Sequence, residues 1–230
     1  MTSRTAQRRN PDLVRKAHDP APRRWLVPAI IIGVVAIAAI IAIVAAGGGS
    51  DKAAETPGLE QVQPVTVSGT PLPTFGGDTA NDPAIGMTIP TVTGKSFDGT
   101  PVTIEATGSP QMLMFVAHWC PHCQREVPIV SDWLKQGGLP AGVQLSTVAT
   151  GTSADAPNYP PSAWLEKNDW PSPIMADSSN ADAATAFGLE SYPYFVWVDG
   201  DGKVAARASG ELTTDQIESV VQQLAAQASG

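Results

Sequence analysis

The sequence predicts an α/β sandwich of three layers around a central mixed sheet, preceded by one transmembrane helix. Two observations predict it. Residues 26–46 form an apolar run of the length that crosses a membrane. From residue 84 onward, strand-length apolar runs alternate with helical spacings. We therefore divide the chain into a basic cytoplasmic tail (1–25), a transmembrane anchor (26–46), an extracytoplasmic linker (47–83) and one folded domain (84–230).

Positive charge is concentrated in the first 25 residues, which carry seven Lys and Arg side chains against two Asp side chains. The formal net charge is −8 for the chain, +5 for this tail and therefore −13 for the remainder. The rest of the chain is acidic enough to repel phosphates, so we expect no nucleic acid partner. Basic residues beside a membrane helix stay on the cytoplasmic side, so we expect everything after Gly47 to lie outside the cytoplasm.

The apolar run Leu26–Ala46 lacks the polar face that a helix in a soluble core shows. As an α-helix it would extend about 30 Å, the thickness of a bilayer core. A cleaved signal peptide is the alternative, because Val44–Ala46 resembles a cleavage site, but the apolar cores of signal peptides are usually about 7–15 residues long. We therefore predict an uncleaved anchor in contact with membrane lipid, in a single-pass protein of the cell membrane.

The segment Gly47–Pro83 is rich in Gly, Pro, Ser and Thr, which predicts a tether between membrane and domain. Within it, Val65–Val67 has the composition of a short edge strand. The compact part is expected to start near Ile85.

The first half of the domain contains the clearest strand. Met112–Ala117 is an unbroken apolar run, typical of a buried central strand. Before it, the turn signal Phe97–Thr100 is followed by a probable strand at Val102–Ile104. After it, a helix is expected to start around Cys120, because apolar residues then recur every three or four positions until Gly137.

The second half continues the alternation of strands and helices. It predicts a strand at Val143–Ala149, a short helix at Pro161–Asn168 and a second strand at Ile174–Ala176. A hairpin is expected to follow, formed by Tyr194–Val198 and Val204–Ala208. A last helix begins at Thr213, where Gln216 three residues on completes a capping box. Strands and helices in this order describe an α/β sandwich.

The chain has only two cysteines, Cys120 and Cys123, separated by two residues. A disulfide across so short a loop would remove little entropy from the unfolded chain, so a reactive pair is the better interpretation. The pair sits where a strand gives way to a helix, and a helix N-terminus favours a thiolate. We expect the first sulfur to be exposed and to attack, and the second to be more buried and to resolve the mixed disulfide.

Three stretches resemble the thioredoxin superfamily, and in particular its membrane-anchored TlpA/ResA-like subgroup. They are the motif Trp119-Cys120-Pro121-His122-Cys123, its continuation Arg125-Glu126-x-Pro128, and Tyr192-Pro193 before a strand. The resemblance covers the chain from about Gly86 to the C-terminus and implies a thioredoxin-like fold and a thiol–disulfide oxidoreductase.

The resemblance also implies roles for residues around the cysteines. Pro193 is expected to be cis and, with Trp119, Pro121 and Tyr192, to line a groove for substrate backbone. The implied partners are thiols or disulfides of exported proteins and a membrane redox protein that recycles the pair. No cofactor is implied.

Two features depart from the patterns of related proteins. The dipeptide Pro121-His122 gives a Cys-Pro-His-Cys motif similar to that of the periplasmic oxidant DsbA, and His122 is expected to stabilise the Cys120 thiolate. A more stable thiolate makes the disulfide a stronger oxidant, so the dipeptide favours oxidation slightly while the subgroup favours reduction. Met114 stands where thioredoxin and DsbA keep a buried acid, and Glu126, three residues after Cys123, is left without a role.

Metal binding is the main alternative. Cys120, Cys123, His118 and His122 could offer sulfur and nitrogen to copper or zinc, as in a copper-carrying assembly module. The resemblance to such carriers would require a wider cysteine spacing and a later histidine, and no histidine follows His122. Peroxide reduction would require a lone peroxidatic cysteine. We therefore expect no metal site.

Overall fold

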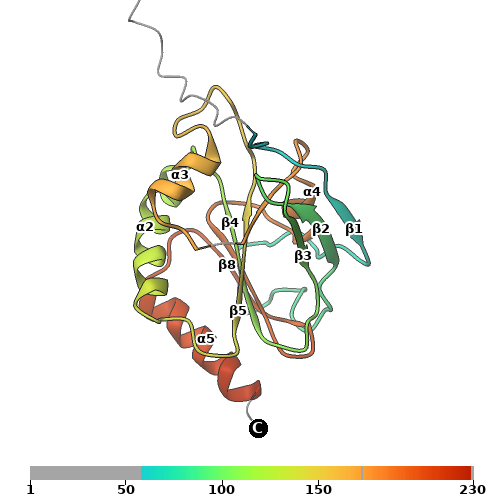
Figure 1. The fold of residues 1–230 in the computed structure, drawn as a ribbon. Helices are drawn as coiled ribbons and strands as arrows, with labels where there is room; N and C mark the ends of the chain where they lie inside the picture. The colour runs from blue at the N-terminus through green and yellow to red at the C-terminus, as the bar shows by residue number, and fades with distance from the viewer. Residues whose placement is uncertain (1–57, 172, 229–230) are drawn as a thin grey trace, which may run out of the picture. The chain divides into compact units, whose positions relative to one another are not determined.

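The computed structural model describes the chain except residues 1–57, 172 and 229–230 (Figure 1). The predicted tail and anchor lie outside the described residues, as does the first part of the predicted linker. Within the part of the chain that the structure describes, no helix has the length and apolar composition needed to cross a membrane.

One mixed sheet of eight strands forms the centre of the domain, in the order β1-β2-β6-β5-β4-β7-β8, with β3 paired to β2. The central strands β4, β5 and β6 are parallel, whereas β2, β7 and β8 join antiparallel. The strands are β1 Thr66–Ser68, β2 Thr91–Lys95, β3 Pro101–Ile104, β4 Gln111–Val116, β5 Gln144–Ala149, β6 Ile174–Ala176, β7 Tyr194–Val198 and β8 Val204–Ser209.

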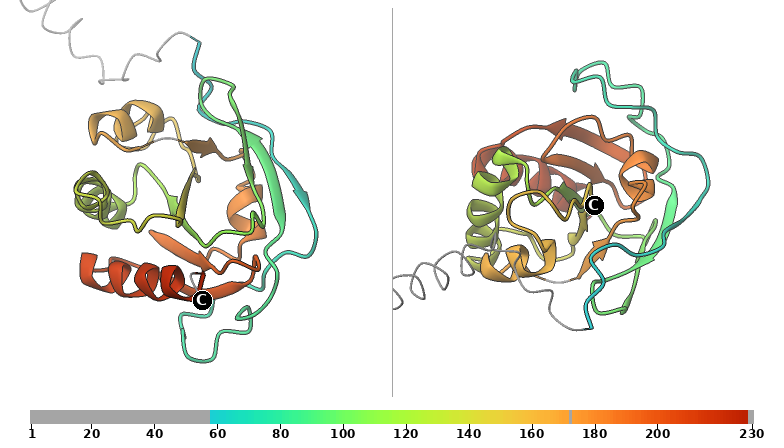
Figure 2. Two further views of the ribbon diagram at one scale, coloured as in Figure 1. Left: turned by 60° about the horizontal axis from the view of Figure 1, so that its bottom comes forward. Right: turned by 90° about the horizontal axis from the view of Figure 1, so that it is seen from above.

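Helices cover both faces of this sheet, which gives the predicted three layers. On one face lie α2 (Pro121–Lys135), α3 (Pro161–Lys167) and α5 (Thr214–Ala228). The short α4 (Asp182–Ala186) lies on the other face, where the N-terminal part of the described chain also runs (Figure 2).

The central strand β4 joins the two apolar cores. Met112 and Met114 pack into the core under α2 and α5, while Leu113 and Phe115 pack into the core under α4. All four side chains are fully buried. A strand whose side chains alternate between two covered faces must be apolar throughout, which is why the unbroken run at 112–117 predicted it correctly.

The folded unit begins earlier than the sequence predicted. Leu72 and Phe75, within the predicted linker, are 4% and 1% exposed and belong to the core under α4. The backbone N–H of Phe75 also donates to the carbonyl of Gly188 at 2.9 Å. Two large apolar side chains are enough to fix this segment, although its average composition is that of a tether. The prediction of a linker as far as residue 83 is therefore wrong for this part.

Two other elements were not predicted. β2 contains Gly94 and has Val92 as its one fully buried side chain, so its alternation is weak. α4 has only five residues, and the Asp177 carboxylate accepts the N–H groups of Ala183 and Ala184 at 2.9 and 3.1 Å. A helix this short depends on such a cap more than on periodicity.

The capping box predicted for the last helix is present. The Gln216 N–H donates to the Thr213 hydroxyl at 3.3 Å, and the Thr213 N–H donates to the Gln216 side chain at 2.8 Å. α5 accordingly starts at Thr214.

Candidate redox site

The two cysteines are free thiols at the start of α2. Cys120 is the N-cap residue, with extended backbone (φ −70°, ψ 121°), and Pro121 follows in the first turn. Proline fits there because the first N–H groups of a helix have no intrahelical partner. Cys120 is 6% exposed and Cys123 is 0% exposed. The second sulfur is the more buried one, as predicted, but the expectation of an openly exposed first sulfur is wrong.

The Tyr192–Pro193 peptide bond is cis, as the resemblance implied. It lies beside the first cysteine, since the Cys120 thiol donates to the Tyr192 carbonyl with an S···O distance of 3.9 Å. The rings of Trp119 and Tyr192 meet edge to face with centroids 5.6 Å apart. These contacts bring the predicted groove residues Trp119, Tyr192 and Pro193 together next to Cys120.

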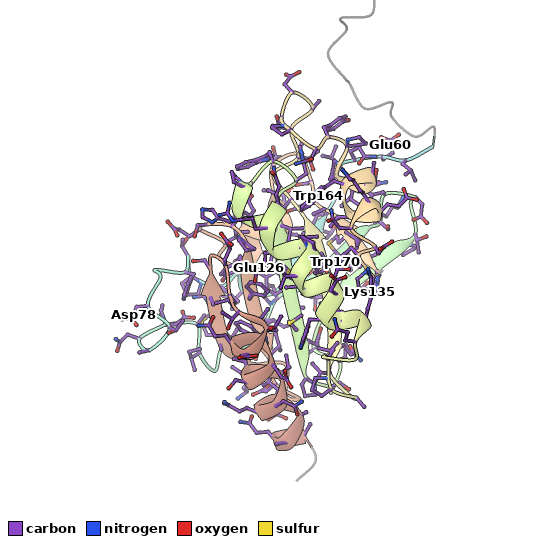
Figure 3. The ribbon with its side chains drawn as sticks, turned by 90° about the vertical axis from the view of Figure 1, so that its left-hand side faces the viewer. Glu60, Asp78, Glu126, Lys135, Trp164 and Trp170 are labelled. Atoms are coloured by element: carbon purple, nitrogen blue, oxygen red, sulfur yellow. The ribbon has the colours of Figure 1, made fainter. Side chains whose placement is uncertain are left out.

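An acidic side chain lies in the protein interior behind the cysteines. Glu126 is 1% exposed and accepts the Leu212 N–H at 3.1 Å, on the side of α2 that faces α5 (Figure 3). Burial raises the pKa of Glu126 to about 7, against the lowering effect of this hydrogen bond. The sequence spacing already indicated that Glu126 is on the buried face of the helix, because it lies three residues after Cys123 and four before Val130.

Burial also raises the pKa of the Cys123 thiol, and the charges of Cys120 and Glu126 raise it further. A hydrogen bond with the Ala117 backbone acts in the opposite direction. Cys123 is therefore a protonated thiol at neutral pH and must lose its proton before it can attack a disulfide. Met114, fully buried and apolar, cannot accept that proton. Glu126 is the ionisable neighbour with a pKa suited to the transfer.

This arrangement agrees with a family comparison. The sequence pattern of the Redoxin family matches residues 84–224. The chain belongs to the Redoxin family. Its enzymatic class is that of an oxidoreductase, with the thioredoxin-like α/β fold expected from the sequence.

Individual proteins similar to this Redoxin-family chain share less than a third of its residues. The methylamine utilization protein MauD of Paracoccus denitrificans is 29% identical over 147 residues, which cover 63% of this chain and 68% of MauD. MauD of Methylobacillus flagellatus is 26% identical over 141 residues, 60% and 63% of the two chains. A thiol:disulfide interchange protein of the thioredoxin family from Chlorobium tepidum TLS superposes with a TM-score of 0.50 at 20% identity, over 60% of this chain and 96% of that one.

His122 binds a carboxylate in the Redoxin domain. Its Nδ1 lies 2.6 Å from Oε1 of Glu211, in the connection between β8 and α5. Arg125 binds the same carboxylate, with its Nε 3.1 Å from both oxygens. The hydrogen bonds from Arg125 and then His122 lower the pKa of Glu211 to about 2. The sequence did not indicate Glu211, because 86 residues separate it from Arg125.

His118 fixes a loop over the site. Its side chain is buried, Nδ1 lies 2.6 Å from the Pro157 carbonyl, and Nε2 accepts the Ser153 N–H at 3.2 Å. A neutral imidazole with its proton on Nδ1 satisfies both contacts. Burial lowers the pKa of His118, which favours this form, although the bond to Pro157 opposes it. The Trp119 indole N–H donates to Gly151 of the same loop at 2.7 Å.

Proposed function

We propose that this oxidoreductase exchanges thiols and disulfides with exported proteins through Cys120 and Cys123. The observation that carries the proposal is the cysteine pair at the start of α2, with Tyr192 and Pro193 beside the first sulfur and Glu126 buried on the same helix. Pro193 and its neighbours Trp119 and Tyr192 would line the groove that receives substrate backbone.

The chemistry is a pair of displacements at sulfur. The Cys120 thiolate attacks a substrate disulfide, forming a mixed disulfide and releasing one substrate thiolate. Cys123 then gives its proton to Glu126 and attacks the Cys120 sulfur, which releases the second substrate thiolate. Two electrons pass to the substrate and the enzyme is left with a Cys120–Cys123 disulfide. The reverse sequence oxidises a substrate dithiol, and a membrane redox partner returns the pair to its starting state.

We propose oxidation of substrates as the direction. The basis is the Pro121-His122 dipeptide, because an imidazole near the Cys120 sulfur would stabilise the thiolate and thereby the reduced form of the enzyme. The copper-carrying alternative finds less support. His118 has both ring nitrogens engaged by backbone and His122 is engaged by Glu211. Among the described residues, no group of three or more His, Cys, Asp and Glu side chains is placed to hold a metal ion.

The test uses the full chain in detergent, equilibrated with glutathione buffers and analysed by alkylation and mass spectrometry. We expect both thiols to oxidise together in one two-electron step, with a reduction potential nearer to that of DsbA, about −120 mV, than to that of thioredoxin, about −270 mV. A potential near the thioredoxin value would reverse the proposed direction. Stoichiometric Cu(I) binding without any exchange would favour the copper carrier.

We further propose that the domain stays attached to the membrane by Leu26–Ala46, with the N-terminus in the cytoplasm. The length and apolarity of that segment support an anchor over a cleaved signal peptide. Mass spectrometry of the mature chain is expected to recover peptides from the segment, and an alkaline wash is expected to leave the protein in the membrane. A soluble mature form that begins near Gly47 would contradict the anchor and leave the proposed chemistry intact.

A further inference from the structure

The connection between β8 and α5 touches the redox site at three points. The Gly210 N–H donates to the carbonyl of Pro193 at 2.9 Å, and the Leu212 N–H donates to Glu126 at 3.1 Å. Between them, the Glu211 carboxylate binds the side chains of His122 and Arg125. The backbone of the connection is therefore fixed by its neighbours, and the Glu211 side chain contacts His122 and Arg125 of α2.

The contacts of Glu211 form a compact cluster of one carboxylate, one guanidinium and one imidazole. Because a carboxylate has no proton to donate, the 2.6 Å contact places a proton on Nδ1 of His122. The Arg125 guanidinium lies 2.9 Å from that same nitrogen. Two donor groups this close repel each other unless they share an acceptor, and Glu211 is the acceptor that both reach.

The cluster lies close enough to the first cysteine for its charge to matter. His122 is two residues from Cys120 on the first turn of α2. The hydrogen bond with Glu211 raises the pKa of Arg125, and the Cys120 charge contributes in the same direction. Interaction between charges is reciprocal, so an uncompensated Arg125 would stabilise the Cys120 thiolate. The Glu211 carboxylate bound to Arg125 reduces that stabilisation.

We propose that Glu211 is a positioning residue that lowers the reduction potential of the Cys120–Cys123 pair by neutralising the charge of Arg125 and holding the His122 ring. The inference rests on the proposed thiol–disulfide exchange and adds the residue that limits its oxidising strength. Without Glu211, positive charge near Cys120 favours the dithiol over the disulfide, so the enzyme becomes the stronger oxidant. His122 of the Cys-Pro-His-Cys motif thus acts together with Glu211, 89 residues further along the chain.

The experiment compares Glu211→Gln with the wild-type full chain. The equilibrium constant with glutathione is expected to shift about tenfold towards the dithiol, which corresponds to about 30 mV for two electrons. The pH of half-maximal alkylation of Cys120 is expected to fall. Both differences should shrink in 1 M salt, because the cluster is exposed to solvent and the screening length is then only about 3 Å. Glu218→Gln, which removes an exposed acid from α5, is the matched control and should leave the potential unchanged.

Two more variants separate charge from structure. Glu211→Asp keeps the charge and is expected to stay near the wild-type potential, and Arg125→Gln removes a cation and is expected to make the potential more negative. An unchanged potential in Glu211→Gln, or equal shifts in Glu211→Gln and Glu211→Asp, would overturn the inference. If Glu211→Gln fails to fold, Arg125→Gln decides by the sign of its shift. Failure of the wild-type protein to exchange disulfides would instead overturn the proposed function.

Discussion

Cys120→Ser is expected to reduce thiol–disulfide exchange to the uncatalysed background, whereas Cys123→Ser is expected to accumulate mixed disulfides with substrates. The reason is the asymmetry of the two thiols. Cys120 is the N-cap residue of α2 and the less buried of the two, while burial and nearby negative charge raise the pKa of Cys123. Without Cys123, nothing at the site displaces a substrate that has become bonded to Cys120.

Insulin reduction by dithiothreitol measures the loss of exchange, and non-reducing electrophoresis of whole cells measures the trapped complexes. Circular dichroism of both variants controls for folding, since Cys123 is fully buried. Alkylation of the reduced wild-type protein at mildly acidic pH is expected to modify Cys120 first. Faster modification of Cys123, or complexes trapped by Cys120→Ser, would reverse the two roles.

The parts of the site that local sequence signals encode were predicted. The apolar run of β4, the cysteine pair at a strand-to-helix junction and Pro193 before β7 each depend on a few neighbouring residues. The structure adds that the Cys120 thiol contacts the Tyr192 carbonyl, that the Trp119 and Tyr192 rings pack together, and that Cys120 is 6% exposed. The spacing of residues along the chain contains no information about these contacts.

The parts that could not be predicted depend on contacts between distant segments. Phe75 looks like an isolated apolar residue in a tether until the surface under α4 is known to receive it. Asp82 likewise forms a fully buried ion pair with Arg207, 125 residues away. Glu211 reaches Arg125 because the sheet brings the end of β8 beside the start of α2. In each case the local composition shows only what kind of segment the residue lies in, whereas its contacts in the fold determine what the residue does.

Glu126 is the second residue whose replacement is expected to have a large effect. Glu126→Gln is expected to slow the resolving step by about 10²-fold at neutral pH, the usual contribution of a positioned general base. The amide keeps an oxygen that can accept the Leu212 N–H, so the geometry is retained. In the wild-type protein the rate should rise as Glu126 loses its proton around pH 7. In the variant it should rise with pH without that step, because Cys123 then gives its proton to solvent.

The same substitution is expected to change the pH dependence of stability. The pKa of Glu126 is about 7 in the folded protein against an ordinary value of 4.5. The folded state therefore binds this proton more tightly than the unfolded chain, and the free energy of unfolding falls as pH rises from 4.5 to 7. Gln has no charge to bury. At pH 8 the variant is expected to be more stable than the wild type by up to about 3 kcal/mol, and at pH 4.5 to match it closely.

Urea denaturation of the reduced full chain at pH 4.5 and pH 8, followed by tryptophan fluorescence, measures this difference. Glu166→Gln, an exposed acid on α3, is the matched control and should leave the pH dependence unaltered. Both measurements test the raised pKa of Glu126. The burial that makes its carboxylate costly to ionise destabilises the protein at high pH and also brings the pKa close to neutrality. A variant that gains no stability at pH 8 and loses no rate would show that Glu126 is not the proton acceptor for Cys123.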